Sequence, residues 1–267
     1  MIDPTDVEAM AALIERLEAR DVIYVGETHD RYDHHLNQLA VIRGLHERGG
    51  EIAIGMEQFQ RPFQRHVDDF VAGRIDAATL LERTEWDRRW RFDVGLYRDI
   101  LDYAQRHGIP IVALNAPTET VRQVSAEGVE GLSAEDRAVF PRRIELARGD
   151  YRDKLESVFQ MHGHHRPDGR LERFLEVQYV WDQSMARSAA DFLDASPDTT
   201  LVVLAGSGHV LHDEAIPSRL RRLHPGTQAV LVTDTGGLPE GAAVDYVFAA
   251  RNLEAAGTGH LAAARGR

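Results

Sequence analysis

Four short apolar runs in this chain each end in polar residues that are able to do chemistry. The runs are residues 22–25, 52–56, 111–114 and 201–205. Ligands of open α/β sheets bind in the crevice beyond the carboxyl ends of the parallel strands. If the four runs are neighbouring parallel strands, the residues that follow them converge at one place, and these residues are Glu27, His29, Glu57, Asn115 and His209.

The order of the apolar runs predicts an α/β fold. Helical patterns separate the runs, and a strand–helix–strand rhythm implies right-handed crossovers and a parallel sheet. Shorter strands are expected at 229–232 and 246–248. We therefore expect a parallel-rich central sheet flanked by helices on both faces, with a helical insertion at about 118–170. Residues 1–250 form one domain in this interpretation, and 251–267 form a disordered tail.

Composition excludes several classes of protein. The chain has 267 residues, of which 43% are hydrophobic, which suits one large soluble domain. Its net charge of −12 argues against a nucleic-acid binder. There is no cysteine, so a disulfide, a thiolate metal site and a cysteine nucleophile are excluded. Any metal site must use nitrogen and oxygen ligands.

The first residues and the lengths of the apolar runs predict where the protein is located. The first residues are acidic and have no apolar stretch, and no run reaches the roughly 20 apolar residues of a membrane span. We expect a cytoplasmic chain without a membrane span; a chain trimmed of an export signal is the alternative.

The candidate catalytic residues are Glu27, His29, Glu57 and His209. Two of the strand ends share the spacing Gly-x-x-His, at 26–29 and 206–209. Glycine permits a sharp turn, and a carboxylate close to an imidazole can orient it or share a cation with it. Both motifs also have a structural interpretation without catalysis. Residues 26–29 would then cap a helix, and His209 would bond to the backbone at the start of a helix.

Glu57 follows a run that reads as a buried strand, where a carboxylate is costly unless it is paired. Its alternative is a structural salt bridge to Arg61. Ser207 does not fit a serine nucleophile, because the hydrolase elbow requires Gly-x-Ser-x-Gly and the chain has Ala205 at the first position.

Five further residues are candidates for ligand binding: His35, Tyr97, Asn115, Gln178 and Asp182. Of the adjacent His34 and His35 in the first crossover helix, we expect one to face inward and the other outward. Gln178 and Asp182 lie on or beside the apolar stripe of a helix at 170–194, where polar groups have a partner, which is an N–H group, an arginine or the site. The histidine-rich loop at 162–165 is either solvated or binds a metal or haem.

The ordered set of these motifs resembles the ChaN family of the haem-binding uptake, Tiki-like superfamily. The similarity covers roughly residues 22–250, with 118–170 as the variable stretch. The matching positions are 24–30, 34–35, Gln38, 56–57, Gln64, Tyr97, Ala104, 108–110, 114–117, Gln178, Asp182, 185–186, 206–209 and 216–217.

This resemblance implies a haem- or iron-handling protein, with haem or a small molecule as partner and a homodimer as the assembly. Tyr97 or a histidine of the 162–165 loop would be the axial ligand of haem. Tiki, TraB and erythromycin esterase-like relatives imply the alternative, a hydrolase in which the site activates water. His29, Glu57 and His209 would then bind a divalent Zn, Mn, Co or Fe ion, or act directly. Family members are often exported lipoproteins, whereas these residues include no signal and no lipid-bearing cysteine.

Overall fold

The computed structural model describes residues 1–138, 140, 146–161, 170–212, 214–238, 241–251 and 253. Within them, six parallel strands form one sheet in the order β3-β2-β4-β1-β5-β6. The α/β class and the parallel sheet are confirmed. The strands are β1 (Val22–Glu27), β2 (Ile52–Gln60), β3 (Ile111–Asn115), β4 (Thr200–Gly206), β5 (Gln228–Thr233) and β6 (Tyr246–Phe248).

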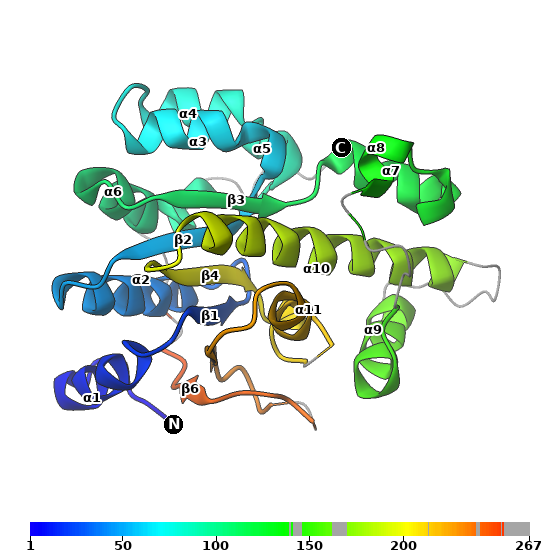
Figure 1. Cartoon of the computed structure of the whole chain (residues 1–267). Coiled ribbons are helices and arrows are strands. Elements are labelled where there is room, and N and C mark those ends of the chain that lie inside the picture. Colours follow the sequence, from blue (N-terminus) through cyan, green and yellow to red (C-terminus); the bar gives the residue numbers. More distant parts are fainter. Residues whose placement is uncertain are drawn as a thin grey trace, which may run out of the picture.

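Helices cover both faces of the sheet, as expected (Figure 1). Because successive strand residues point to opposite faces, Ile23 and Val25 belong to one apolar core and Val22 and Tyr24 to the other. The first core includes residues of α1 (Val7–Leu17), α2 (Tyr32–Glu47), α3 (Gln64–Val71), α4 (Ala77–Arg83) and α6 (Arg98–His107). The second includes residues of α10 (Arg170–Ala195) and α11 (Ile216–Leu223).

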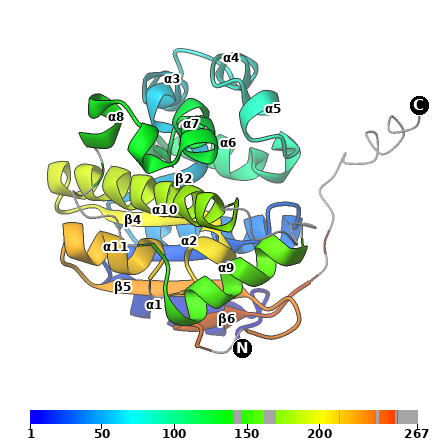
Figure 2. The ribbon, with the colours of Figure 1, turned by 90° about the vertical axis from the view of Figure 1, so that its right-hand side faces the viewer.

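The expected insertion is helical where the structure describes it. It contains α7 (Thr118–Glu127), the 3₁₀ turn η3 (Val129–Gly131), α8 (Ala134–Ala138) and α9 (Gly149–Met161). These helices lie beyond the carboxyl ends of the strands (Figures 1 and 2). There they pack against the N-terminal part of α10, which extends past the sheet. The insertion therefore lies over the edge of the sheet at which the site was expected. The 162–165 loop lies outside the described residues.

Strand β2 is longer than the sequence indicated. We expected it to end at Met56, but it continues to Gln60 with every residue buried. Its pairing with β4 ends at Met56, and its register with β3 shifts between Met56 and Gln60. Glu57 therefore lies where β2 leaves β4, at an irregularity of the strand rather than after its end.

The connection from β2 to α6 contains three short elements in addition to α3 and α4. They are the 3₁₀ turns η1 (Arg61–Phe63) and η2 (Val94–Leu96) and the helix α5 (Trp86–Arg89). Two non-glycine residues near α5 have a left-handed backbone, Glu85 with φ 52° and Arg91 with φ 72°. These bends turn the chain so that Trp90 and Phe92 pack on the His29 ring.

No helix in the part of the chain given above is long and apolar enough to cross a membrane. The tail expected at 251–267 lies outside the described residues, except for Arg251 and Leu253. Arg251 is held by hydrogen bonds to Asp33 and Asn37 of α2.

Candidate functional site

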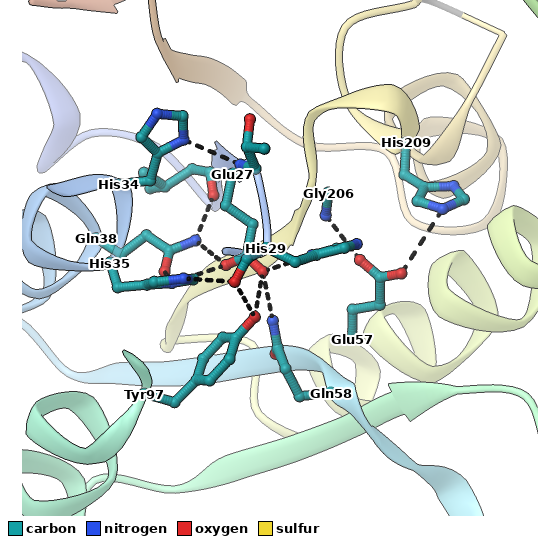
Figure 3. A network of polar contacts seen from close by, with 12 residues as sticks. Glu27, His29, His34, His35, Gln38, Glu57, Gln58, Tyr97, Gly206 and His209 are labelled. Atoms are coloured by element: carbon teal, nitrogen blue, oxygen red, sulfur yellow. Dashed lines mark hydrogen bonds and ion pairs between the residues drawn. The ribbon is translucent and has the colours of Figure 1, made fainter. Parts of the chain in front are cut away.

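Glu27, the last residue of β1, is the centre of a buried polar cluster. Its side chain is fully enclosed and accepts from five side chains (Figure 3). Its donors are His29 Nδ1 at 2.8 Å, His35 Nδ1 at 3.2 Å, Gln38 Nε2 at 2.7 Å, Gln58 Nε2 at 3.1 Å and the Tyr97 hydroxyl at 2.8 Å. A buried carboxylate is stable only when it is paired and hydrogen-bonded. We call these six residues the Glu27 cluster.

Charges in this cluster are set by mutual pairing. Burial alone would raise the pKa of Glu27, but the hydrogen bonds from His29 and His35 outweigh it and hold that pKa well below its ordinary value. Burial would lower the pKa of both histidines, but the bonds to Glu27 raise it. His35 also donates from Nε2 to the His29 carbonyl, so both of its ring nitrogens face acceptors.

Glu57 faces the ring of His29 from β2. Its Oε2 accepts from the Gly206 backbone N–H at 2.7 Å, and its Oε1 lies 3.7 Å from His209 Nε2. Only 7% of its side chain is exposed. The alternative role as a partner of Arg61 is not what the structure shows, because Arg61 lies by Asp191. Glu57 therefore lies between the two Gly-x-x-His motifs.

His209 has a carboxylate partner of its own. It ends the 3₁₀ turn η4 (Ser207–His209), and its Nδ1 donates to Asp182 Oδ1 of α10 at 2.6 Å. Asp182 is fully buried, and its Oδ2 accepts from the Tyr151 hydroxyl of α9 at 2.7 Å. Burial would lower the pKa of His209, but the charges of Glu57 and Asp182 raise it to about 9. These two carboxylates therefore favour the imidazolium form of the ring at neutral pH.

A cavity of about 390 Å³ opens over these groups. His29, Glu57 and His209 contribute to its polar lining, together with Gln58, Gln60, Arg89 and Asn115. The remaining lining is mainly aromatic and apolar: Trp90, Phe92, Trp181, Ala116, Val121 and Thr118. This volume and this mixture of walls are typical of a small-molecule site.

The other predicted residues fall into two groups. Asn115 lines the cavity, and its Nδ2 donates to the Glu57 carbonyl at 3.0 Å. His35 and Tyr97 lie in the Glu27 cluster behind the cavity, and Gln178 lies on α10 outside its lining. The expectation that one of the adjacent histidines faces outward is wrong. Both are buried, because His34 Nδ1 accepts from the Thr28 N–H while His35 bonds to Glu27.

The described side chains do not form a metal site. In the ranges that the structure covers, no group of three or more His, Asp or Glu residues is placed to hold a metal ion. The imidazole nitrogens that reach the cavity are those of His29 and His209, whose Nδ1 atoms are both bonded to carboxylates. In both histidines, Nε2 is therefore the ring nitrogen that is able to contact a ligand.

Several residues of the site were not found by sequence reasoning. They are Tyr151, Gln58, Gln60, Arg89, Phe92, Thr118, Val121 and Trp181. Gln58 and Gln60 had one available signal, since they follow Glu57 in the sequence. Tyr151 lies on an apolar stripe with Leu155 and Phe159, at i, i+4 and i+8, and all three are buried. That stripe predicts which face of the helix is buried, but it does not predict that Tyr151 contacts Asp182.

Comparisons with known proteins place these features in a family. Residues 13–220 match the sequence model of the family described as haem-binding uptake, Tiki superfamily, ChaN. A solved structure of ChaN from Campylobacter jejuni, described as showing cofacial haem binding, is similar with a TM-score of 0.70 and 18% identity. That similarity covers 88% of this chain and 89% of the other.

Two further similarities were found. A mutant erythromycin esterase in its open conformation gives a TM-score of 0.52 with 14% identity, over 85% of this chain and 73% of the other. Protein RETICULATA-RELATED 5, a chloroplastic protein of Arabidopsis thaliana, is 23% identical over 239 residues, which are 82% of this chain. The chain spans only 31% of the length of that relative. At these identities the solved structures bear on the fold alone.

Proposed function

This chain belongs to the ChaN family of haem-binding uptake proteins in the Tiki superfamily, and we propose that it handles haem or iron through the cavity over Glu57. The observation that supports this proposal most directly is the pair of carboxylate-held imidazoles, His29 and His209, in a cavity with aromatic walls. Such a cavity offers nitrogen ligands next to flat apolar surfaces.

The donor set fits an iron porphyrin. Haem iron takes an axial ligand from residues such as histidine or tyrosine. Tyr97 is fully buried, and its hydroxyl already donates to Glu27, so it does not fit this role in the present arrangement. His29 or His209 would hold the iron through Nε2 once that nitrogen has released its proton to solvent, since only a deprotonated nitrogen can ligate a metal. Trp90, Phe92 and Trp181 would contact the porphyrin ring. Bound haem would supply an iron centre for storage, transfer or redox chemistry.

Titration with hemin tests this proposal. We expect the protein to give a saturable shift of the Soret band, and His29→Ala or His209→Ala to lower the affinity at least tenfold. His224→Ala is the matched control, because His224 also donates from Nδ1 to a carboxylate, that of Asp194, but does not line the cavity. Equal hemin uptake by all four proteins would contradict the proposal.

The assembly is part of the same proposal. A homodimer is what the family resemblance implies, and light scattering with and without hemin measures it directly. A mass that doubles with hemin would link assembly to the ligand, whereas a monomer in both states would remove the dimer from the proposal.

Hydrolysis is the second candidate function, and one specific observation favours it. His209 lies between two carboxylates, Asp182 at 2.6 Å from its Nδ1 and Glu57 Oε1 at 3.7 Å from its Nε2, and their charges favour its imidazolium form. A carboxylate base beside a cationic acid is the arrangement that general acid–base catalysis requires. The cavity could then cleave an ester or a related acyl bond.

Each residue has a defined role in this second proposal. Glu57 takes a proton from water while the water oxygen bonds to the acyl carbon. His209 Nε2–H gives its proton to the leaving oxygen as the acyl–oxygen bond breaks, and His29 stabilises the charge that develops on the carbonyl oxygen. The proton on Glu57 then returns to His209, and the site is restored.

A panel of esters with Glu57→Gln tests the hydrolase. We expect a rate loss of about 100-fold or more, because the variant keeps the shape but loses the base. In the described residues, His29, Glu57 and His209 are not placed to hold a metal ion together, so a metal form of this proposal, with a Zn, Mn, Co or Fe ion, requires their side chains to move. Elemental analysis of protein purified without chelator tests that form. About one equivalent of metal that is lost in His29→Ala would support that form.

A further inference from the structure

We propose that Tyr151, in the insertion helix α9, is a positioning residue that holds His209 in place through Asp182. The inference rests on the proposed role of His209 in the cavity. It assigns a part in the site to an element that lies outside the strand ends and that shares no local motif with them.

The contacts form a continuous chain from α9 to the cavity. The Tyr151 hydroxyl donates to Asp182 Oδ2 at 2.7 Å, and Asp182 Oδ1 accepts from His209 Nδ1 at 2.6 Å. Each carboxylate oxygen thus has a different partner, and these two contacts fix the plane of the carboxylate. A fixed carboxylate holds the imidazole with Nδ1 as donor, so that Nε2 faces Glu57 and the cavity.

Tyr151 is itself firmly placed. It is 3% exposed, and its ring stacks on the His212 ring with centroids 5.1 Å apart. It belongs to a small apolar core with Leu155, Leu175 and Ala215 that joins α9 to α10 and to the segment before α11. A buried hydroxyl that is directed by this packing is suited to orient a second side chain.

The two histidines of the site depend on their carboxylates in different ways. Glu27 accepts from five side chains, so the loss of one donor leaves four. In the described part of the chain, the hydrogen bonds found for the Asp182 side chain are those from Tyr151 and His209. Removal of the Tyr151 hydroxyl therefore leaves a buried carboxylate oxygen without its donor, and the carboxylate becomes free to turn.

The first test needs no ligand. The proton on His209 Nδ1 in a 2.6 Å bond to a carboxylate should give a far-downfield NMR signal in slow exchange with water. We expect Tyr151→Phe to speed its exchange about tenfold, which is the order of effect of one hydrogen bond to a charged group. Asp182→Asn, which removes the acceptor, should abolish the signal and so identify it.

Tyr103→Phe is the matched control. Tyr103 is also buried and its hydroxyl is bonded to a histidine, His46, at 2.9 Å, but it does not line the cavity. Thermal unfolding and circular dichroism establish that the variants keep the fold. An unchanged His209 signal in folded Tyr151→Phe, or an equal change in Tyr103→Phe, would overturn the inference.

A second readout separates this inference from the proposed function. If His209 acts in the cavity, Tyr151→Phe should also lower hemin affinity or ester turnover about tenfold, while Tyr103→Phe leaves both unchanged. A faster proton exchange with unaltered hemin binding and turnover would support the positioning role and contradict the function proposed for His209.

Discussion

Gly206 and His29 lie so close together that a methyl group on the glycine would meet the imidazole ring. A Cβ at Gly206 would be 2.9 Å from His29 Cε1 and 3.2 Å from Nε2. The ring has little room to retreat, because Glu27 holds its Nδ1 and Trp90 and Phe92 pack on it. The second Gly-x-x-His motif thus contributes its glycine to the placement of the first motif's histidine.

Gly206→Ala should therefore displace His29. We expect a loss of stability of about 1–3 kcal/mol, as is typical of overpacking, and at least a tenfold loss of hemin affinity or turnover. Gly208→Ala is the control, since a Cβ there would meet nothing within 4 Å. Thermal unfolding and hemin titration measure both effects. If the two alanine variants have the same stability and the same hemin affinity, the close contact between Gly206 and His29 does not matter for function.

Glu27→Gln tests whether the Glu27 cluster is stabilised by charge. The amide nitrogen that replaces one oxygen cannot accept from the donors that now surround it, and the histidines lose their counter-charge. We expect a loss of about 3 kcal/mol or more in the free energy of unfolding, as for other buried pairs that lose one partner. Urea titration at pH 7 measures this loss.

Glu119→Gln is the control for that experiment. Glu119 forms a bidentate pair with Arg89, but its side chain is 63% exposed. An exposed pair contributes less than about 1 kcal/mol. A loss for Glu27→Gln as small as that for Glu119→Gln would show that the cluster tolerates a neutral centre.

Much of the fold was predictable from hydrophobic pattern alone. The four buried runs and the polar residues after them indicated a parallel sheet with Glu27, His29, Glu57 and His209 at one edge. The structure brings these four together, because β1, β2 and β4 are adjacent. Local pattern is sufficient here because a strand that is buried on both faces must be apolar along its length. The polar residues at its end therefore stand out in the sequence.

The rest of the site depends on contacts between distant segments, which pattern does not record. Asp182 was noticed as a polar group beside an apolar stripe, but its partners lie 27 and 31 residues away. The extension of β2 was missed for a related reason. Gln58 and Gln60 look like loop residues, yet they are buried because Glu27, Thr118 and Arg89 supply their hydrogen bonds.

Gln64 should protect the open edge of the sheet. Its Nε2 donates to the Ile111 carbonyl at 2.8 Å and its Oε1 accepts from the Ala113 N–H at 2.6 Å, so the side chain pairs with β3 as a neighbouring strand would. Unpaired edges promote association between chains. Gln64→Ala should lower stability by about 1–2 kcal/mol and increase aggregation, as measured by light scattering during heating. The exposed neighbour Arg65 offers the control, Arg65→Ala, for which neither change is expected.

The dependence of stability on pH should report the charge on His209. Its pKa rises from 6.5 to about 9 on folding, so the folded state holds this proton more tightly than the unfolded chain does. The resulting stabilisation is complete below pH 6.5 and is lost as the pH rises through about 9, and it is on the order of 3 kcal/mol.

Glu27 affects stability at the acidic end of the pH range. Its pKa is lowered on folding, so its contribution is present above pH 4.5 and is lost as the pH falls further.

Urea unfolding between pH 6 and 9.5 separates these contributions. The wild-type protein should lose stability as the pH rises over this range, whereas His209→Gln should show a markedly smaller slope. His29 and His35, whose pKa values are also raised, account for the slope that remains. His224→Gln, which removes a histidine paired with Asp194 away from the cavity, should keep the wild-type slope. Parallel curves for the wild type and His209→Gln would mean that the ring between Asp182 and Glu57 is not charged at neutral pH, and the acid role proposed for it in ester cleavage would then be wrong.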